Sequence, residues 1–97
     1  QSEGMDRLFK AVLALQSPEE CYMFFEDLCT ISELESISQR LKVATLLREK
    51  HTCNDISQAT GASTATISRV NRCLLHGTGG YPLVLARIQE GGWIFPV

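Results

Sequence analysis

The chain has 97 residues, of which 44% are hydrophobic and 21% are charged, and its net charge is −2 at neutral pH. This length predicts one domain, residues 1–97, and this apolar fraction excludes a disordered chain. The apolar runs are too short to span a bilayer, and no charged and then apolar leader precedes a small-residue cleavage site. We therefore expect a cytoplasmic protein without membrane contact.

The small net charge conceals an uneven distribution along the chain. Residues 1–36 contain two basic and eight acidic side chains, a charge of −6, whereas residues 37–76 contain six basic and two acidic ones, a charge of +4. Nucleic acid responds to the local field, so the middle of the chain is the part that would face a phosphate backbone. Two solvated faces of opposite charge are the alternative interpretation.

The first two predicted helices are amphipathic. Residues 5–15 place apolar side chains on one face of a helix, and residues 1–4 are left out of this prediction. Ser17 and Pro18 predict the second helix, with serine as the N-cap and proline at the first helical position. Both helices are more apolar than a small isolated domain needs, which favours a dimer. The apolar residues are Leu8, Phe9, Val12, Leu13 and Leu15, then Tyr22, Phe24, Phe25, Leu28 and Cys29.

A third helix is expected to begin near Thr30 or Ser32 and to continue to about Lys50. Ser32 and Glu35 have the spacing of a capping box only if Ser32 is the N-cap. Basic residues close this helix, where the helix dipole favours positive charge. Its apolar positions are Leu34, Ile37, Leu41, Ala44 and Leu47.

The next segment predicts two helices joined by a tight turn. Residues 54–60 form a short helix candidate with Ile56 and Ala59 facing inward. Gly61 follows where a left-handed residue is needed, with the small residues Ser57 and Ala62 nearby. Ser63 then caps a helix from Thr64 to about His76, which Gly77 ends. This second helix carries Ile67, Val70 and Leu74 toward a core.

This arrangement indicates a helix-turn-helix whose second helix enters the major groove of DNA. Short side chains on its outer face let the backbone approach base edges, while arginines and the amides at its start reach phosphates. The predicted DNA-binding residues are Ser63, Thr64, Ala65, Thr66, Ser68, Arg69 and Arg72. An ordinary helical hairpin, whose Ser and Thr only cap and solvate it, is the alternative.

The four cysteines have wide and irregular spacing: Cys21, Cys29, Cys53 and Cys73. No pair forms C-x-x-C, which argues against a zinc knuckle or a disulfide framework. His51 with Cys53 and Cys73 with His76 are conceivable ligand pairs, but small buried thiols and histidines at helix ends explain them more simply. We expect no metal. No nucleophile has a base at motif spacing and no phosphate loop is present, so we expect no enzymatic activity.

The last part of the chain predicts a helix beginning near Pro82, with an apolar side formed by Leu83, Val84, Leu85 and Ile88. The apolar segment Trp93–Val97 is expected to fold back onto the core or onto a partner subunit. A docking site for another protein is the alternative, because exposed patches of this kind usually mark contacts.

Three stretches carry a resemblance to a known family: "SQRLKVATLL", "CNDISQATGASTATISRVNRCL" and "GTGGY". From about Thr30 to Gly77 the chain resembles the tryptophan-repressor-like (TrpR-like) proteins, and over its whole length their YerC/YecD group. The resemblance implies an all-α, multi-helix TrpR-like fold and an intertwined homodimer. It places the helix-turn-helix at about residues 54–76 and the N-terminal dimerisation helices at about residues 5–50. It also implies transcriptional repression.

In the tryptophan repressor a bound amino acid sets the spacing of the two reading heads. The resemblance puts four residues of this chain in the corresponding pocket: Thr30, Arg40, Thr66 and Arg69, with Arg69 set to meet a carboxylate. Val70 and Cys73 stand where that repressor has glycine and serine, and Val70 would intrude on the ligand ring. We therefore expect no cofactor and no tryptophan binding, or a different small-molecule effector. Phosphate contact or a surface ion pair is the alternative role of Arg40 and Arg69.

Together these features predict a sequence-specific transcriptional regulator, a dimeric repressor that binds double-stranded DNA. The alternative is a non-enzymatic protein-interaction module that uses a helix-turn-helix fold without DNA.

Overall fold

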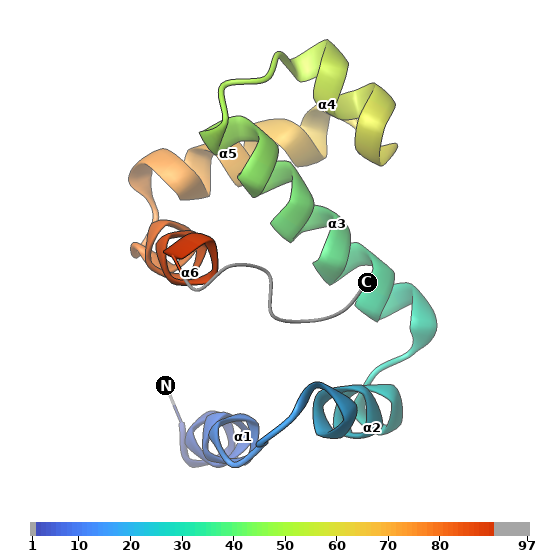
Figure 1. Cartoon of the computed structure of the whole chain (residues 1–97), viewed down its shortest axis with the longest axis vertical. Coiled ribbons are helices and arrows are strands. Elements are labelled where there is room, and N and C mark those ends of the chain that lie inside the picture. Colours follow the sequence, from blue (N-terminus) through green and yellow to red (C-terminus); the bar gives the residue numbers. More distant parts are fainter. Residues whose placement is uncertain (1, 91–97) are drawn as a thin grey trace. The chain divides into compact units, whose positions relative to one another are not determined.

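The computed structural model describes residues 2–90 (Figure 1). Its helices are α1 (Glu3–Leu13), α2 (Pro18–Leu28), α3 (Ile31–Arg48), α4 (Cys53–Thr60), α5 (Thr64–His76) and α6 (Gly80–Glu90). Residues 2–90 contain no strand, and the predicted all-α fold is confirmed. None of the helices described is long and apolar enough to cross a membrane. The segment Trp93–Val97 lies outside the described residues.

The chain divides into two compact units, residues 1–34 and residues 35–97. The N-terminal unit contains α1, α2 and the first residues of α3. The C-terminal unit contains the rest of α3 together with α4, α5 and α6.

Helix α1 begins earlier than the predicted residue 5 because Ser2 provides an N-cap. The Ser2 Oγ accepts a hydrogen bond from the Met5 amide at 3.2 Å. Glu3 and Asp6 place negative charge at the positive end of the helix dipole. Leaving residues 1–4 out of the helix was therefore wrong for Glu3 and Gly4, and the helix also ends earlier, at Leu13.

The caps of α2 and α3 follow from local sequence. Ser17 caps α2 as predicted, with its Oγ accepting from the Glu20 amide at 3.1 Å. At α3 the capping box is formed by Thr30 and Glu33, not by Ser32 and Glu35. The Glu33 amide donates to Thr30 Oγ1 at 3.1 Å, and the Thr30 amide donates to Glu33 Oε1 at 2.8 Å. Two amides without helical partners are thereby satisfied reciprocally.

The N-terminal unit leaves its apolar faces largely uncovered within one chain. Neither α1 nor α2 contains a buried residue. Phe24 and Phe25 pack edge to face, with ring centroids 5.4 Å apart. Leu13 is 85% exposed and Ile31 is 77% exposed. The other exposed large apolar side chains of this unit are Met5, Phe9, Tyr22, Met23 and Leu28.

The C-terminal unit is built around one apolar cluster to which α3, α4, α5 and α6 all contribute. Each fully buried Val, Leu or Ile side chain contributes about 1.5–3 kcal/mol to folding. The cluster consists of Val43, Ala44, Ile56, Ala62, Ile67, Val70 and Leu85. Leu41, Leu46, Leu47, Leu74, Tyr81 and Ile88 pack against it, half-buried.

The cluster agrees with most of the predicted core positions and corrects four of them, among them Ile37 of α3, which is 48% exposed. Ala44, Ile56, Ile67 and Val70 are buried as predicted. Ala59 is exposed, because α4 turns only the side of Ile56 toward the cluster. Leu83 and Val84 are also exposed, since α6 directs Leu85 inward with Tyr81 and Ile88 at one-turn spacings from it. Val43 had not been predicted.

The predicted turn between α4 and α5 is confirmed. Gly61 has φ 74°, the left-handed conformation that glycine adopts without a steric penalty. Ser63 caps α5, its Oγ accepting from the Thr66 amide at 3.1 Å. Gly77 follows the last residue of α5. A Cβ added at Gly77 would lie 2.3 Å from the Cys73 carbonyl oxygen.

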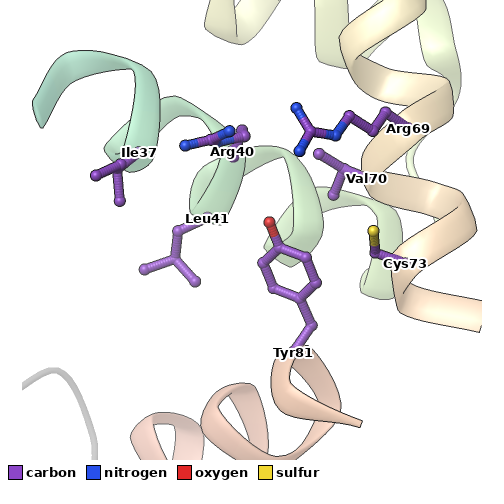
Figure 2. A pocket seen from close by; sticks show the side chains of 7 residues that line it. All are labelled: Ile37, Arg40, Leu41, Arg69, Val70, Cys73 and Tyr81. Carbon is purple, nitrogen blue, oxygen red and sulfur yellow. The ribbon is translucent and has the colours of Figure 1, made fainter. Parts of the chain in front are cut away.

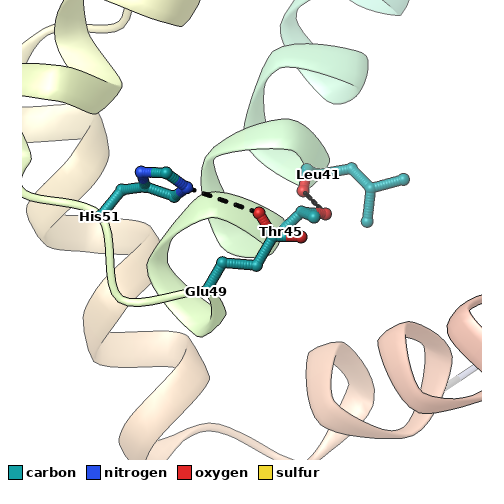
Figure 3. A network of polar contacts seen from close by, with 4 residues as sticks. All are labelled: Leu41, Thr45, Glu49 and His51. Atoms are coloured by element: carbon teal, nitrogen blue, oxygen red, sulfur yellow. Dashed lines mark hydrogen bonds and ion pairs between the residues drawn. The ribbon is translucent and has the colours of Figure 1, made fainter.

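Helix α3 ends in a Schellman arrangement that uses a lysine in place of the usual glycine. Lys50 has φ 70°, its amide donates to the Leu47 carbonyl at 3.0 Å, and the His51 amide donates to the Leu46 carbonyl at 3.1 Å. Figure 3 shows the same region with the Glu49–His51 pair, in which His51 Nε2 lies 3.6 Å from Glu49 Oε1. That pair is ionic only when His51 is protonated.

We expect Gly61→Ala to lower the free energy of unfolding by about 1 kcal/mol, because an L-residue is strained at this φ. No atom lies within 4 Å of the added Cβ, so the effect comes from the backbone alone. Gly80→Ala is the matched control, since its Cβ also meets open space and its φ is not positive. Denaturant titration at one protein concentration measures both, and equal losses would contradict the prediction.

Candidate functional site

Helix α5 has one buried face and one exposed face. Ile67 and Val70 are buried in the cluster, 3% and 1% exposed. Because side chains three and four positions apart share a helix face, the opposite side forms a continuous outward stripe. That stripe contains Ala65, Ser68, Arg69 and Arg72, all exposed.

The first backbone amides of α5 have no carbonyl partners within the helix, as at every helix start. Ser63 and Thr64 are exposed at this end, and the Ser63 Oγ donates to Thr66 Oγ1 at 3.1 Å as well as capping the helix. Thr66 is half-buried, and its hydroxyl oxygen accepts this hydrogen bond from the N-cap Ser63. Of the seven predicted DNA-binding residues, the structure therefore brings six to the exposed side, and Thr66 lies behind them.

The turn before α5 is held by side chains that bond to the backbone. The Ser57 Oγ donates to the Ala62 carbonyl at 3.1 Å, and the Ala62 amide donates to Thr60 Oγ1 at 3.1 Å. From α3, the Gln39 Nε2 donates to the Thr60 carbonyl at 3.1 Å. Gln39 was not among the predicted functional residues, although it lies one helical turn before the buried Val43 and therefore on the same face of α3.

A cavity of about 300 Å³ lies between α3, α5 and α6 (Figure 2). Arg40 and Arg69 reach it from different helices, and Figure 2 shows the Tyr81 hydroxyl pointing toward their guanidinium groups. Val70 and Cys73, expected to alter an effector pocket, are both part of its wall. The complete lining is Ile37, Arg40, Leu41, Arg69, Val70, Cys73 and Tyr81.

The four predicted effector residues are thus brought together only in part. Arg40 and Arg69 line this cavity, whereas Thr66 is engaged with Ser63 and is not in the lining. Thr30 is the N-cap of α3 and belongs to the N-terminal unit. Tyr81 is an additional polar group that the sequence analysis missed, and its place after two glycines gave no signal of it.

The electrostatics of the cavity favour an anion. Two guanidinium groups line it and no carboxylate does. Among the side chains described in residues 2–88, the only acid–base contact within ion-pair distance joins Glu49 and His51, so no carboxylate neutralises either arginine there. Since guanidinium groups donate in a planar fork that matches carboxylate and phosphate oxygens, an acidic group is the chemical partner that this lining suits.

The cysteines do not occupy the core. Cys53 and Cys73 are exposed and Cys21 and Cys29 are half-buried, so the interpretation of all four as buried thiols was wrong. Within the described part of the chain, no group of three His, Cys, Asp or Glu side chains is placed to hold a metal ion. His76 ends α5, as expected for a helix-end histidine.

Comparison with models of known protein families gives a match over most of the chain. Residues 3–89 match the model of the Trp repressor protein family. The chain belongs to the Trp repressor protein family. This is a family of regulatory proteins, not of enzymes.

Individual relatives agree over nearly the whole length. The uncharacterized protein YerC of Bacillus subtilis (strain 168) is 55% identical over 90 residues, which are 93% of this chain and 86% of YerC. The crystal structure of a candidate Trp repressor from Staphylococcus aureus has a TM-score of 0.89 at 48% identity, covering 92% of this chain and 89% of that one. A TrpR-like protein from Eubacterium eligens ATCC 27750 also has a TM-score of 0.89, at 52% identity and 92% coverage of both chains.

Proposed function

We propose that the protein is a cytoplasmic, sequence-specific DNA-binding regulator, a dimeric repressor that reads the major groove with α5. The outward stripe of α5 carries this proposal, because it combines short side chains with arginines directly after a tight turn. Membership of the Trp repressor protein family supports it.

The two kinds of side chain on α5 suit two kinds of contact. Thr64, Ala65 and Ser68 are short enough to let the helix approach base edges, where hydroxyl and methyl groups discriminate between base pairs. Arg69 and Arg72 are long and exposed, and the amides at the helix start favour a phosphate. Base contacts would therefore come from the first turns of α5, and phosphate contacts from its cap and its arginines.

The charge of the C-terminal unit supports phosphate binding. None of the six lysine and arginine side chains in residues 37–76 has a carboxylate oxygen within ion-pair distance among the described residues. Each phosphate that such a side chain neutralises releases counterions, so affinity should fall steeply with salt. The side chains concerned are Arg40, Lys42, Arg48, Lys50, Arg69 and Arg72.

The exposed apolar faces of α1 and α2 support a homodimer. Exposure of several large apolar side chains on two helices is typical of an interface, and neither helix buries a residue within its own chain. A second copy of the chain is the partner we propose, with the helices of residues 5–50 forming the interface. A two-fold dimer would place two α5 helices on half-sites about 34 Å apart along the duplex.

We propose that the cavity beside α5 does not bind tryptophan. Val70 forms part of its wall and is held in place by the core, since it is only 1% exposed. At about 300 Å³ the cavity lies at the lower limit of small-molecule sites, which span about 300–1,000 Å³. Arg40 and Arg69 then serve either a different acidic effector or the DNA phosphates.

Selection of bound sequences from a random duplex pool at near-physiological salt tests the proposed function. We expect enrichment of an inverted repeat whose half-sites are about one helical turn apart. Arg69→Ala should weaken binding to specific and random duplexes alike, because it removes a phosphate contact. The slope of log affinity against log salt concentration should fall in magnitude by about one. Thr64→Ala and Ser68→Ala should mainly change the enriched sequence, with about 1–3 kcal/mol lost at the base pair concerned.

Two outcomes contradict these expectations at different levels. Equal losses for all three variants on specific and random DNA would show that the division into base and phosphate contacts is wrong. Failure of the wild-type protein to enrich any sequence, together with an absence of salt-dependent binding, would favour a protein-interaction module that does not use DNA.

The dimer predicts that Leu13→Asp lowers self-association. In an isolated chain this side chain is 85% exposed, so its substitution would change folding stability by less than about 0.5 kcal/mol. Under a partner subunit, the introduced carboxylate would be desolvated and dimerisation weakened. Sedimentation equilibrium measures the dimer constant, and Gln16→Asp adds the same charge at an exposed polar position of the same unit. Identical behaviour of both variants would exclude Leu13 from the interface.

Calorimetric titration with tryptophan is expected to give no binding heat at micromolar concentrations, because Val70 occupies space beside Arg69. A micromolar dissociation constant would overturn this prediction. The same titration of a Val70→Ala variant shows whether the side-chain volume at this position is the obstacle, since the change enlarges the cavity and keeps both arginines.

A further inference from the structure

One side-chain hydrogen bond differs from all others that the structure shows among the side chains of residues 2–88. The Gln39 Nε2 donates to the Thr60 carbonyl at 3.1 Å and joins residues 21 positions apart. Every other side-chain hydrogen bond described joins residues no more than five positions apart, such as the Ser57 Oγ bond to the Ala62 carbonyl. Gln39 therefore provides the directional polar link between α3 and the helix-turn-helix.

The acceptor of this bond is a group that α4 leaves without a helical partner. Thr60 is the last residue of α4, and the final carbonyls of a helix need partners from outside it. The Thr60 hydroxyl is used locally: it donates to the Ile56 carbonyl at 2.7 Å and accepts from the Ala62 amide. The other hydrogen bonds of the turn are thus local. The Gln39 bond to the Thr60 carbonyl is the one that attaches the turn to α3.

Apolar packing alone leaves the orientation of the helix-turn-helix less defined. Val43 and Ala44 of α3 are fully buried against the cluster, and burial of this kind is non-directional. A hydrogen bond, in contrast, weakens steeply when its angle departs from linearity. Gln39 lies one helical turn before Val43 on α3. Its hydrogen bond adds this angular restraint at the end of α4, beside the apolar contact.

We propose that Gln39 is a positioning residue for DNA reading: its amide sets the orientation of α4 and α5 against α3, and so the angle at which α5 meets the groove. The inference rests on the proposed function. The neighbouring Arg40 lines the cavity together with Arg69 of α5, so consecutive residues of α3 meet the turn and the reading helix. Since α3 lies within residues 5–50, the segment proposed for dimerisation, the Gln39 bond links that segment to the helix-turn-helix of the same chain.

The test compares wild-type protein with Gln39→Met and the control Gln16→Met. Methionine keeps the length and shape of glutamine and removes the donor. The Gln16 side chain is exposed and makes no hydrogen bond among the described residues. For each full-length protein, dissociation constants are measured by fluorescence anisotropy, at a temperature far below melting, for the duplex that wild-type protein enriches and for a scrambled duplex of equal length.

Gln39→Met is expected to lower affinity for the enriched duplex by about three- to tenfold, because a smaller fraction of molecules holds α5 at the reading angle, and to leave affinity for the scrambled duplex unchanged within about twofold. Hydrogen exchange of the Gly61 amide should also become faster, because the end of α4 loses a restraint. In Gln39→Lys an ammonium group can donate to the Thr60 carbonyl, and slow exchange at Gly61 should return. Gln16→Met should match wild type in every measurement.

The outcomes separate this inference from the function on which it rests. If wild-type protein has no preferred sequence, the proposed function fails and this inference fails with it. If wild-type protein has one and Gln39→Met keeps the same ratio of specific to scrambled affinity, only the positioning role of Gln39 is overturned. A lower melting temperature with an unchanged ratio would mean that the Gln39 bond stabilises the fold without orienting α5.

Discussion

The burial of Ile67 and Val70 is the contact on which the arrangement of the C-terminal unit depends. These two side chains fix the rotation of α5 about its own axis, since both enter the cluster formed with Val43, Ala44 and Ile56. Once they face inward, helical geometry leaves the stripe from Ala65 to Arg72 no alternative to facing outward. The proposed DNA-reading surface is thus a consequence of packing. Substitutions in the core would change the orientation of these surface residues without replacing any of them.

The turn between α4 and α5 shows how backbone conformation and polar satisfaction act together. Gly61 allows the chain to reverse, but the polar groups around it still need partners. Ser57, Thr60 and Gln39 supply these partners from within α4 and from α3. The turn is therefore both tight and attached to the rest of the unit, which is what a helix that reads DNA requires of its support.

The two units of the chain differ in how much apolar surface each buries within itself. The C-terminal unit buries a continuous cluster, whereas α1 and α2 bury no residue and expose large apolar side chains such as Leu13 and Tyr22. The N-terminal unit also carries most of the acidic residues. A chain of this kind is consistent with a regulator in which one segment recognises DNA and another recognises a second copy.

Local sequence determined much of the secondary structure of this protein. Ser17 with Pro18, Gly61 and Ser63 each act within a few residues, through caps and backbone conformations that are properties of short segments, and so the helices from α2 to α5 were predicted close to their observed bounds. The outward residues of α5 followed from the period of the helix.

Tertiary structure decided the features that depend on contacts between distant segments. Ala59, Leu83 and Val84 were predicted to face a core, but which side of α4 and α6 is buried depends on where the cluster lies. The Gln39 bond to Thr60 and the position of Tyr81 in the cavity likewise follow from the packing of α3 and α6 against α5. Sequence period and caps act over one or two helical turns, whereas these contacts join residues far apart in the chain, and only the folded arrangement brings them together.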